Sequence, residues 1–159
     1  MKQKFFAPGR TELAGNHTDH QRGRILASAV DLGLYAECEK NGENLIRIHS
    51  DGYKSFEVRL DHMSIRTSEF GTPKALVRGM VAGFRELGLA VGGFDARVTT
   101  TLPAGSGLSS SAAYTVLIGE ILSTLFNDGK VDPLVIARAA QQAENKYFGK
   151  PCGLMDQLS

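Results

Sequence analysis

The chain has 159 residues, of which 42% are hydrophobic, and its formal net charge is +1 at pH 7. This length can hold one hydrophobic core, and the small net charge gives no electrostatic reason to expect a nucleic acid or an anionic membrane as a partner. Two cysteines, Cys38 and Cys152, are too few for a disulfide framework and lack metal-ligand spacing. No apolar run of signal-peptide length follows the N-terminal lysines, and Gly119 and Glu120 interrupt the apolar segment 116–122. We therefore expect a cytoplasmic globular protein.

Hydrophobic periodicity in the first part of the chain predicts strands. The segment 25–39 is rich in apolar, β-branched and aromatic residues, which favour a strand. Asn41-Gly42 then predicts a hairpin turn into a second strand at 45–49. After Asp51-Gly52, apolar residues alternate with charged ones over 56–60 and predict a third strand.

The middle of the chain predicts a helix and a further strand. Apolar residues spaced four, four and three apart over 76–87 lie on one face of a helix. Pro73 stands near its first turn and Gly88 fits its C-terminal end. Alternation over 94–102 predicts a strand that leads directly into a loop rich in glycine and serine.

That loop, 103–113, reads Pro-Ala-Gly-Ser-Gly-Leu-Ser-Ser-Ser-Ala-Ala and precedes an expected buried helix over 112–125. Glycine permits positive φ and close approach to a ligand. The first N–H groups of a helix lack intrahelical partners and lie at the positive end of its dipole. Such a junction binds anions, most often phosphate, and its serine hydroxyls can cap the helix, bond phosphate oxygens or reach Mg²⁺. The loop predicts a phosphate site, although similar loops also occur in proteins that bind no ligand.

Three common glycine-rich phosphate motifs do not fit this loop. A P-loop ends in Gly-Lys-Ser/Thr, whereas the two Gly-Lys pairs of the chain precede Val131 and Pro151. The dinucleotide fingerprint needs a third glycine where Ser110 stands. The protein-kinase glycine loop fails at the same position, and its partner motifs are absent.

A second polar cluster lies at 7–20, which reads Ala-Pro-Gly-Arg-Thr-Glu-Leu-Ala-Gly-Asn-His-Thr-Asp-His. Its density of hydrogen-bonding groups suits a polyhydroxylated ligand, because each sugar hydroxyl both donates and accepts. His17 and His20 could instead be ordinary surface residues or a fragment of a metal site, but no cysteine or third histidine lies nearby. Arg10 alone would ordinarily be a solvated charge, and its place between a glycine and this cluster adds a functional interpretation beside that one.

A third cluster lies near the C-terminal end. A helix capped by Asp132, with Pro133 at its first position, is expected to run to about Tyr147. Glu144 falls in its last turn, where a negative charge opposes the helix dipole, so a cation is a reasonable partner. Asp156 follows a glycine-bearing turn and has apolar neighbours that could desolvate it, and it is equally compatible with a turn-capping role.

Together the three clusters resemble the galactokinases, within the GHMP superfamily of kinases for galactose, homoserine, mevalonate and phosphomevalonate. The loop 103–113 resembles the superfamily's nucleotide-binding motif in the triple-serine form of galactokinases. Pro8-Gly9-Arg10 through Asp19 resembles the galactokinase signature, and 153–157, Gly-Leu-Met-Asp-Gln, resembles the segment that carries the catalytic aspartate. The motifs follow the family's order, and the resemblance covers nearly the whole chain.

The resemblance implies an α+β fold of two layers, a mostly antiparallel sheet packed against helices, as in the GHMP kinase N-terminal lobe and the ribosomal protein S5 domain 2-like fold. Residues 1–159 would form this N-terminal domain, with the sugar-binding signature at 7–20, the ATP-binding loop at 103–113 and the catalytic aspartate segment at 153–157. Family members run far beyond Asp156 into a C-terminal lobe. We therefore expect a monomeric chain without that lobe and with little or no kinase activity alone.

The resemblance also implies roles in the reaction of galactose and ATP to galactose 1-phosphate and ADP. Asp156 would be the base that takes the proton from the anomeric hydroxyl, and Arg10 would lie between it and the transferred phosphoryl group. Ser111 and Glu144 would hold Mg²⁺, and Ser50 would correspond to a nucleotide-contacting serine. Backbone N–H groups would surround the ATP phosphates at Gly105, Ser106, Gly107, Leu108, Ser109, Ser110 and Ser111. The residues that would bind sugar hydroxyls are Asn16, His17, Thr18 and Asp19.

Two positions depart from the galactokinase pattern. Asn16 stands where the family usually carries glutamate, and His20 stands where it usually carries an aromatic residue. An amide donates where a carboxylate only accepts, so a related sugar or sugar acid is an alternative substrate. A GHMP kinase for another alcohol and a catalytically silent sugar sensor are the other possibilities. The intact serine loop, Glu144 and Asp156 argue against a silent protein.

Overall fold

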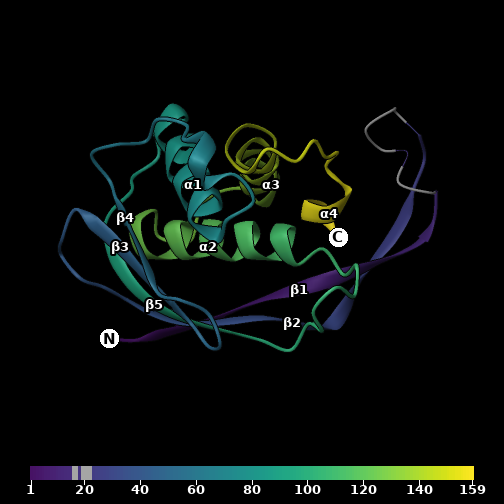
Figure 1. The fold of residues 1–159 in the computed structure, drawn as a ribbon, viewed down its shortest axis with the longest axis horizontal. Helices are drawn as coiled ribbons and strands as arrows, with labels where there is room; N and C mark the ends of the chain where they lie inside the picture. The colour runs from purple at the N-terminus through teal and green to yellow at the C-terminus, as the bar shows by residue number, and fades with distance from the viewer. Residues whose placement is uncertain (16–17, 19–22) are drawn as a thin grey trace.

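The computed structural model describes residues 1–15, 18 and 23–159. A five-stranded sheet forms one layer, and helices cover one of its faces to form the other (Figure 1). The strands are β1 (Gln3–Ala14), β2 (Leu26–Lys40), β3 (Leu45–Ser50), β4 (Phe56–Arg59) and β5 (Phe94–Thr100). The helical elements are a 3₁₀ turn η2 (Thr67–Glu69), α1 (Pro73–Glu86), α2 (Ser110–Phe126), α3 (Pro133–Gln142), the π-helix η3 (Ala143–Phe148) and α4 (Met155–Leu158).

The sheet has the order β1-β2-β5-β3-β4, and every neighbouring pair is antiparallel except β3 and β5. The helix α2 lies along β1 and β2, while α1 packs against α2 and the β4 side of the sheet (Figure 1). The apolar faces of both layers form one buried core. The expected two-layer α+β fold is confirmed, and four of the five strands, β2 to β5, lie where the sequence predicted strands. Among the described helices, none combines the length and apolar character needed to cross a membrane.

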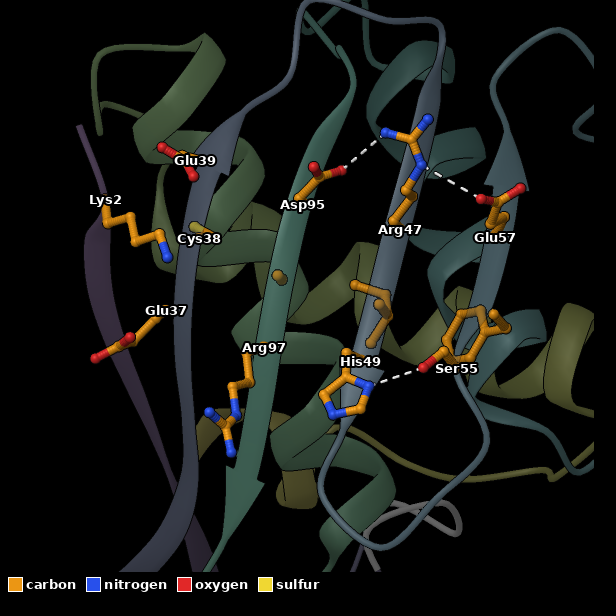
Figure 2. Close-up of a pocket in the computed structure, with 13 residues that line it drawn as sticks. Lys2, Glu37, Cys38, Glu39, Arg47, His49, Ser55, Glu57, Asp95 and Arg97 are labelled. Atoms are coloured by element: carbon orange, nitrogen blue, oxygen red, sulfur yellow. Dashed lines mark hydrogen bonds and ion pairs between the residues drawn. The ribbon is translucent and has the colours of Figure 1, made fainter.

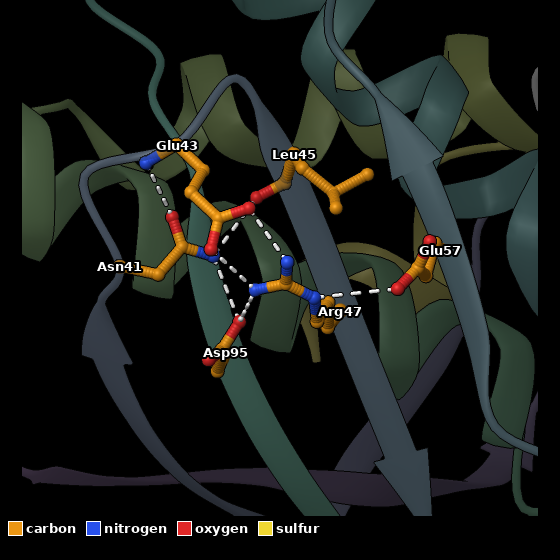
Figure 3. Close-up of polar contacts among 6 residues, drawn as sticks. All are labelled: Asn41, Glu43, Leu45, Arg47, Glu57 and Asp95. Atoms are coloured by element: carbon orange, nitrogen blue, oxygen red, sulfur yellow. Dashed lines mark hydrogen bonds and ion pairs between the residues drawn. The ribbon is translucent and has the colours of Figure 1, made fainter.

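The hairpin expected at Asn41-Gly42 is wrong, because β5 lies between β2 and β3. Gly42 does turn the chain at a φ of 72°, but Asn41 ties that turn to the neighbouring strand. Its side-chain Nδ2 donates to the Leu45 carbonyl at 3.0 Å and to Asp95 Oδ1 at 2.8 Å (Figure 3). The Asn41 amide donates to the Gly93 carbonyl just before β5. The connection therefore spans the width of one inserted strand.

The strand β1 is a second difference, because 7–20 was interpreted as a polar cluster and no strand was predicted before it. β1 is an edge strand that pairs with β2 from Gln3 to Ala14. Its alternation ends at Pro8-Gly9-Arg10, where Gly9 and Arg10 are buried in succession. Because of this break, the alternation of buried and exposed residues that predicts a strand is not visible in the sequence of β1.

The helix expected to run to about Tyr147 forms, but its last part is wound as a π-helix. α3 ends at Gln142 and continues without interruption into η3. Asp132 caps α3 by accepting from the Leu134 amide at 2.7 Å, and Pro133 is its first residue, as predicted. Short π-helical segments are rare in proteins overall, and those that occur often lie at functional sites.

The helix-free face of the sheet carries a hollow of about 750 Å³ among charged side chains (Figure 2). These charges bind one another. Arg47 contacts Glu43 at 2.6 Å and Glu57 at 3.3 Å (Figure 3), and Arg97 contacts Asp51 at 3.1 Å. Because exposed pairs of this kind are well solvated, this face is a hydrated surface rather than a candidate site.

Candidate active site

Arg10 and Asp156, 146 residues apart in the sequence, meet in one buried ion pair. Arg10 Nε and Nη2 lie 2.6 Å and 2.5 Å from Asp156 Oδ1. The two side chains are only 7% and 12% exposed. Arg10 Nη1 also donates to the Gly107 carbonyl at 3.1 Å. The guanidinium therefore bridges a carboxylate on α4 and the backbone of the glycine-rich loop.

A bulge in the sheet aims Arg10 at this position. Pro8 pairs with Gly33, but Arg10 pairs with Ala29, so extra residues of β2 lie opposite Gly9. Bulges of this kind redirect side chains and recur beside active sites. Gly9 lets the bulge approach the loop, since a Cβ there would lie 2.9 Å from the Leu108 carbonyl oxygen. The Arg10 amide donates to that same oxygen at 3.2 Å.

The glycine-rich loop has the backbone geometry expected of an anion site. Gly105 and Gly107 adopt φ values of 72° and 71°. Ser109 precedes α2 in the left-handed conformation at a φ of 54°, which is strained for a residue other than glycine. Its side chain makes no cap hydrogen bond, so the first-turn N–H groups of α2 receive no cap from it. These N–H groups remain available to an anion at the positive end of a 17-residue helix.

Glu144 lies behind Ser111 and is fully buried. Ser111 Oγ donates to Glu144 Oε2 at 3.2 Å, and Gln157 Nε2 donates to Glu144 Oε1 at 3.3 Å. Burial raises the pKa of Glu144 above its ordinary value, while the positive charge of Lys150 and the hydrogen bond from Ser111 oppose this shift. The carboxylate is thus held by donors on two other elements.

The Ser111 and Glu144 oxygens fit a magnesium ion. In octahedral coordination at about 2.0–2.1 Å, adjacent oxygens of Mg²⁺ lie about 2.9 Å apart. The 3.2 Å between Ser111 Oγ and Glu144 Oε2 is close to such an edge. Within the described residues, no group of three or more His, Cys, Asp or Glu side chains could hold a metal on its own. A cation here would complete its shell with phosphate oxygens and water.

These groups surround a hollow of about 520 Å³. It is lined by Arg10, the loop, Asp156 and the segment around Lys150 and Cys152. A second, mostly apolar hollow of about 490 Å³ shares Ser110 and Ser111 with the first. Its further lining includes Leu34, Ser50, Leu76, Val98, Tyr114 and Phe148. Ser50 thus lines the same hollow as Ser110 and Ser111, and its contact with a nucleotide stays a prediction.

The sugar-binding residues expected in the signature are only partly covered by the structure. Asn16, His17 and Asp19 lie outside the described residues. Thr18 is described, and its Oγ1 donates to the Gly15 carbonyl at 2.7 Å. Sugar binding by these four residues therefore stays a prediction.

The structure brings Arg10, Ser111 and Asp156 together with the loop, Lys150 lines the same hollow, and Gln157 contacts Glu144. The roles that the resemblance implied for Arg10, Ser111 and Asp156 stay predictions. Gln157 was noted only as part of the 153–157 motif, and Lys150 only as part of a Gly-Lys pair. A polar residue directly after a candidate base was the one available signal for Gln157. Its contact with Glu144 depends on tertiary packing, which no local pattern encodes.

Comparison with known proteins agrees with this geometry. A model of the GHMP kinases N terminal domain matches residues 75–159, and a model of the galactokinase galactose-binding signature matches residues 2–40. The chain belongs to the GHMP kinase family. Within this family, it matches the N-terminal region of galactokinases.

The galactokinase of Bacillus subtilis is 36% identical over 157 residues, which cover 98% of this chain and 40% of that protein. The galactokinase of Pyrococcus furiosus is 38% identical over 154 residues, 96% of this chain and 42% of that protein. The crystal structure of Lactococcus lactis galactokinase complexed with galactose superimposes with a TM-score of 0.90 at 29% identity, covering 98% of this chain and 40% of that one. Methanococcus jannaschii mevalonate kinase shares the fold, with a TM-score of 0.81 at 22% identity over 99% of this chain and 50% of that one. The chain thus spans about two fifths of the curated relatives it matches.

Proposed function

We propose that this chain is the N-terminal lobe of a sugar kinase that transfers the γ-phosphoryl group of ATP to the anomeric hydroxyl of galactose. The products are galactose 1-phosphate and ADP. One observation carries the proposal: Arg10 bridges the Asp156 carboxylate and the Gly107 carbonyl, so a candidate base and a phosphate-type loop share one hollow. The galactose-binding signature match supports the choice of sugar.

The loop binds the ATP phosphates in this proposal. Backbone N–H groups from Gly105 to Ser111 surround the phosphate oxygens, and the uncapped start of α2 adds its positive potential. The apolar hollow beside the loop receives the adenine base, because it adjoins the phosphates through Ser110 and Ser111. Ser111 and Glu144 would hold Mg²⁺, which would neutralise charge on the phosphate oxygens.

Asp156 and Arg10 carry the chemical step. The anomeric oxygen attacks the γ-phosphorus, Asp156 accepts the hydroxyl proton, and ADP leaves as the bond to its oxygen breaks. Arg10, 2.6 Å from the carboxylate, stabilises negative charge on the transferred phosphoryl oxygens. The reaction thus depends on positioning and electrostatics.

The signature at 7–20 supplies the sugar contacts in this proposal, through Asn16, His17, Thr18 and Asp19. The amide of Asn16, in place of the usual glutamate, keeps a related sugar or sugar acid as the alternative substrate. A silent sugar sensor remains the second candidate, because the galactose-binding signature could serve binding alone.

Phosphorylation of a hexose panel by Mg²⁺ and ATP, followed by ³¹P NMR, tests the proposal. The 159-residue chain should turn over little or not at all, because it spans only about two fifths of the galactokinases it matches and because the four-residue helix that carries Asp156 is too short to be stable by itself. Fused to the part of the Bacillus subtilis galactokinase beyond the matched region, it should form galactose 1-phosphate, and Asp156→Asn should abolish the product. The matched control is Asp128→Asn, an exposed aspartate away from the site. A fusion that binds ATP and galactose but forms no sugar phosphate would favour the sensor, and robust turnover by the chain alone would contradict the expected need for a second lobe.

A further inference from the structure

Gln157 connects the two halves of the candidate site. Its side chain is only 6% exposed, and its Nε2 donates to Glu144 Oε1 at 3.3 Å. The preceding residue, Asp156, points the other way and contacts Arg10. Two neighbouring residues of α4 therefore bind two different charged groups: Asp156 binds Arg10, and Gln157 binds Glu144.

The contacts form two arms that meet at α4. One arm runs from the glycine-rich loop through Arg10 to Asp156. The other runs from Gln157 through Glu144 to Ser111 at the start of α2. Both arms end on the same loop–helix junction, so the polar contacts form a closed circuit through α4. One amide, that of Gln157, joins Glu144 to α4 in this circuit.

The oxygen of the Gln157 side-chain amide, Oε1, could accept a hydrogen bond from water bound to a cation. Within the described part of the chain, Gln157 Oε1 is buried and has no hydrogen-bond partner. A buried acceptor without a donor is costly and persists chiefly where it has a function. Mg²⁺ in proteins keeps several water molecules, and their O–H groups are donors. Residues that bind metal ligands and metal-bound water in this way tune metal affinity.

We propose that Gln157 is a positioning residue for the cation, a role that rests on the proposed function of Ser111 and Glu144. Its Nε2 holds Glu144 Oε1, so that Oε2 is left to face Ser111 and Mg²⁺. Because Gln157 follows Asp156 on a four-residue helix, the same bond fixes the base segment when the cation is bound.

Nucleotide binding by the fusion described above, in which the part of the Bacillus subtilis galactokinase beyond the matched region follows the chain, tests this role. The Kd of a fluorescent ATP analogue is measured in EDTA and in excess Mg²⁺ for the unchanged fusion, Gln157→Leu and the control Gln142→Leu. Gln142 is an exposed glutamine at the end of α3. Gln157→Leu should lose the gain in affinity that Mg²⁺ gives, by about tenfold, the lower end of the range for groups that orient metal ligands. Its affinity in EDTA should not change, and Gln142→Leu should match the unchanged fusion in both conditions.

A second measurement separates positioning from folding. Gln157→Asn keeps the amide but is one methylene too short for the 3.3 Å contact, so it should show the same loss. Water-proton relaxation by Mn²⁺ in the ternary complex should report weaker cation binding for both variants. Full retention of the Mg²⁺ effect in either variant refutes the role of Gln157 while the proposed function stands. An unchanged fusion that binds no ATP, or binds it without any effect of Mg²⁺, overturns the proposed function and this role together.

Discussion

Gly9→Ala should disturb the contact between β1 and the glycine-rich loop without touching any charged group of the site. The added Cβ would lie 2.6 Å from Leu102 Cδ2 and 2.9 Å from the Leu108 carbonyl oxygen. The leucine methyl can rotate away, but the carbonyl belongs to the loop backbone. Because ordinary Cβ contacts begin at 3.4 Å, the loop must move by about 0.5 Å.

That movement would lengthen the hydrogen bond from the Arg10 backbone N–H to the Leu108 carbonyl oxygen, which measures 3.2 Å. Lengthened by about 0.5 Å, it no longer meets the criteria of a hydrogen bond. Overpacking costs about 1–3 kcal/mol, and the lost bond adds about 1 kcal/mol. Replacing glycine by alanine also lowers the conformational entropy of the unfolded chain, which stabilises the folded state by about 0.4–1 kcal/mol. The net destabilisation should be about 1–3 kcal/mol, and ATP should bind more weakly because the loop is displaced.

Urea unfolding gives the free energy of unfolding, and titration with a fluorescent ATP analogue gives the affinity. Gly83→Ala is the matched control, since its Cβ would lie 3.3 Å from Ala139 Cβ in the helix layer, away from the loop. It should leave ATP affinity unchanged. If Gly9→Ala keeps both the stability and the ATP affinity of the unchanged chain, the argument that Gly9 sets the distance between β1 and the loop is refuted.

Two further predictions concern buried titratable groups. Burial raises the folded-state pKa of Glu144 above its ordinary value, so the folded chain binds this proton more tightly than the unfolded chain. Its stability should therefore fall as pH rises from about 4.5 through the folded pKa. Glu144→Gln should remove that part of the pH dependence in urea unfolding and be more stable than the unchanged chain at pH 7, and a steeper fall in the variant would contradict the sign. Burial also raises the pKa of the Cys152 thiol to about 11, so the rate of its alkylation should be slow near pH 8 and should rise towards pH 11. Because Cys152 lines the hollow, ATP should reduce this rate. Rapid labelling at pH 7 would show that the thiol is not desolvated.

The sequence predicted those parts of the fold that depend on short-range pattern. Period-two alternation located β5 and β4, and capping residues located the start of α3 at Pro133. The pairing of β2 with β5 could not be predicted, because the Asn41-Gly42 turn specifies only that the chain reverses. Which strand fills the neighbouring position is decided by burial of Phe94, Ala96 and Val98 on the core face of β5.

In the candidate site, too, local sequence pattern predicted some features, whereas those that depend on strand register and packing could not be predicted. Its residue types were evident from three motifs, and the meeting of Arg10 with Asp156 followed the resemblance. The bulge at Gly9 could not be predicted, because it requires the register of β1 against β2. The contact of Gln157 with Glu144 was equally hidden, since both residues are buried by packing of α4 on the helix layer.

The helix α4 explains why the site is sensitive to changes in its polar residues. Four residues are far too few for a helix that is stable by itself. Met155 packs into the protein interior at 5% exposure, and the contacts of Asp156 and Gln157 hold the rest. The groups proposed for chemistry therefore also fix the segment that carries them. Replacing Arg10 by an uncharged residue removes both the charge beside Asp156 and the contacts that join α4 to the loop, so its effects on activity and on stability should be coupled.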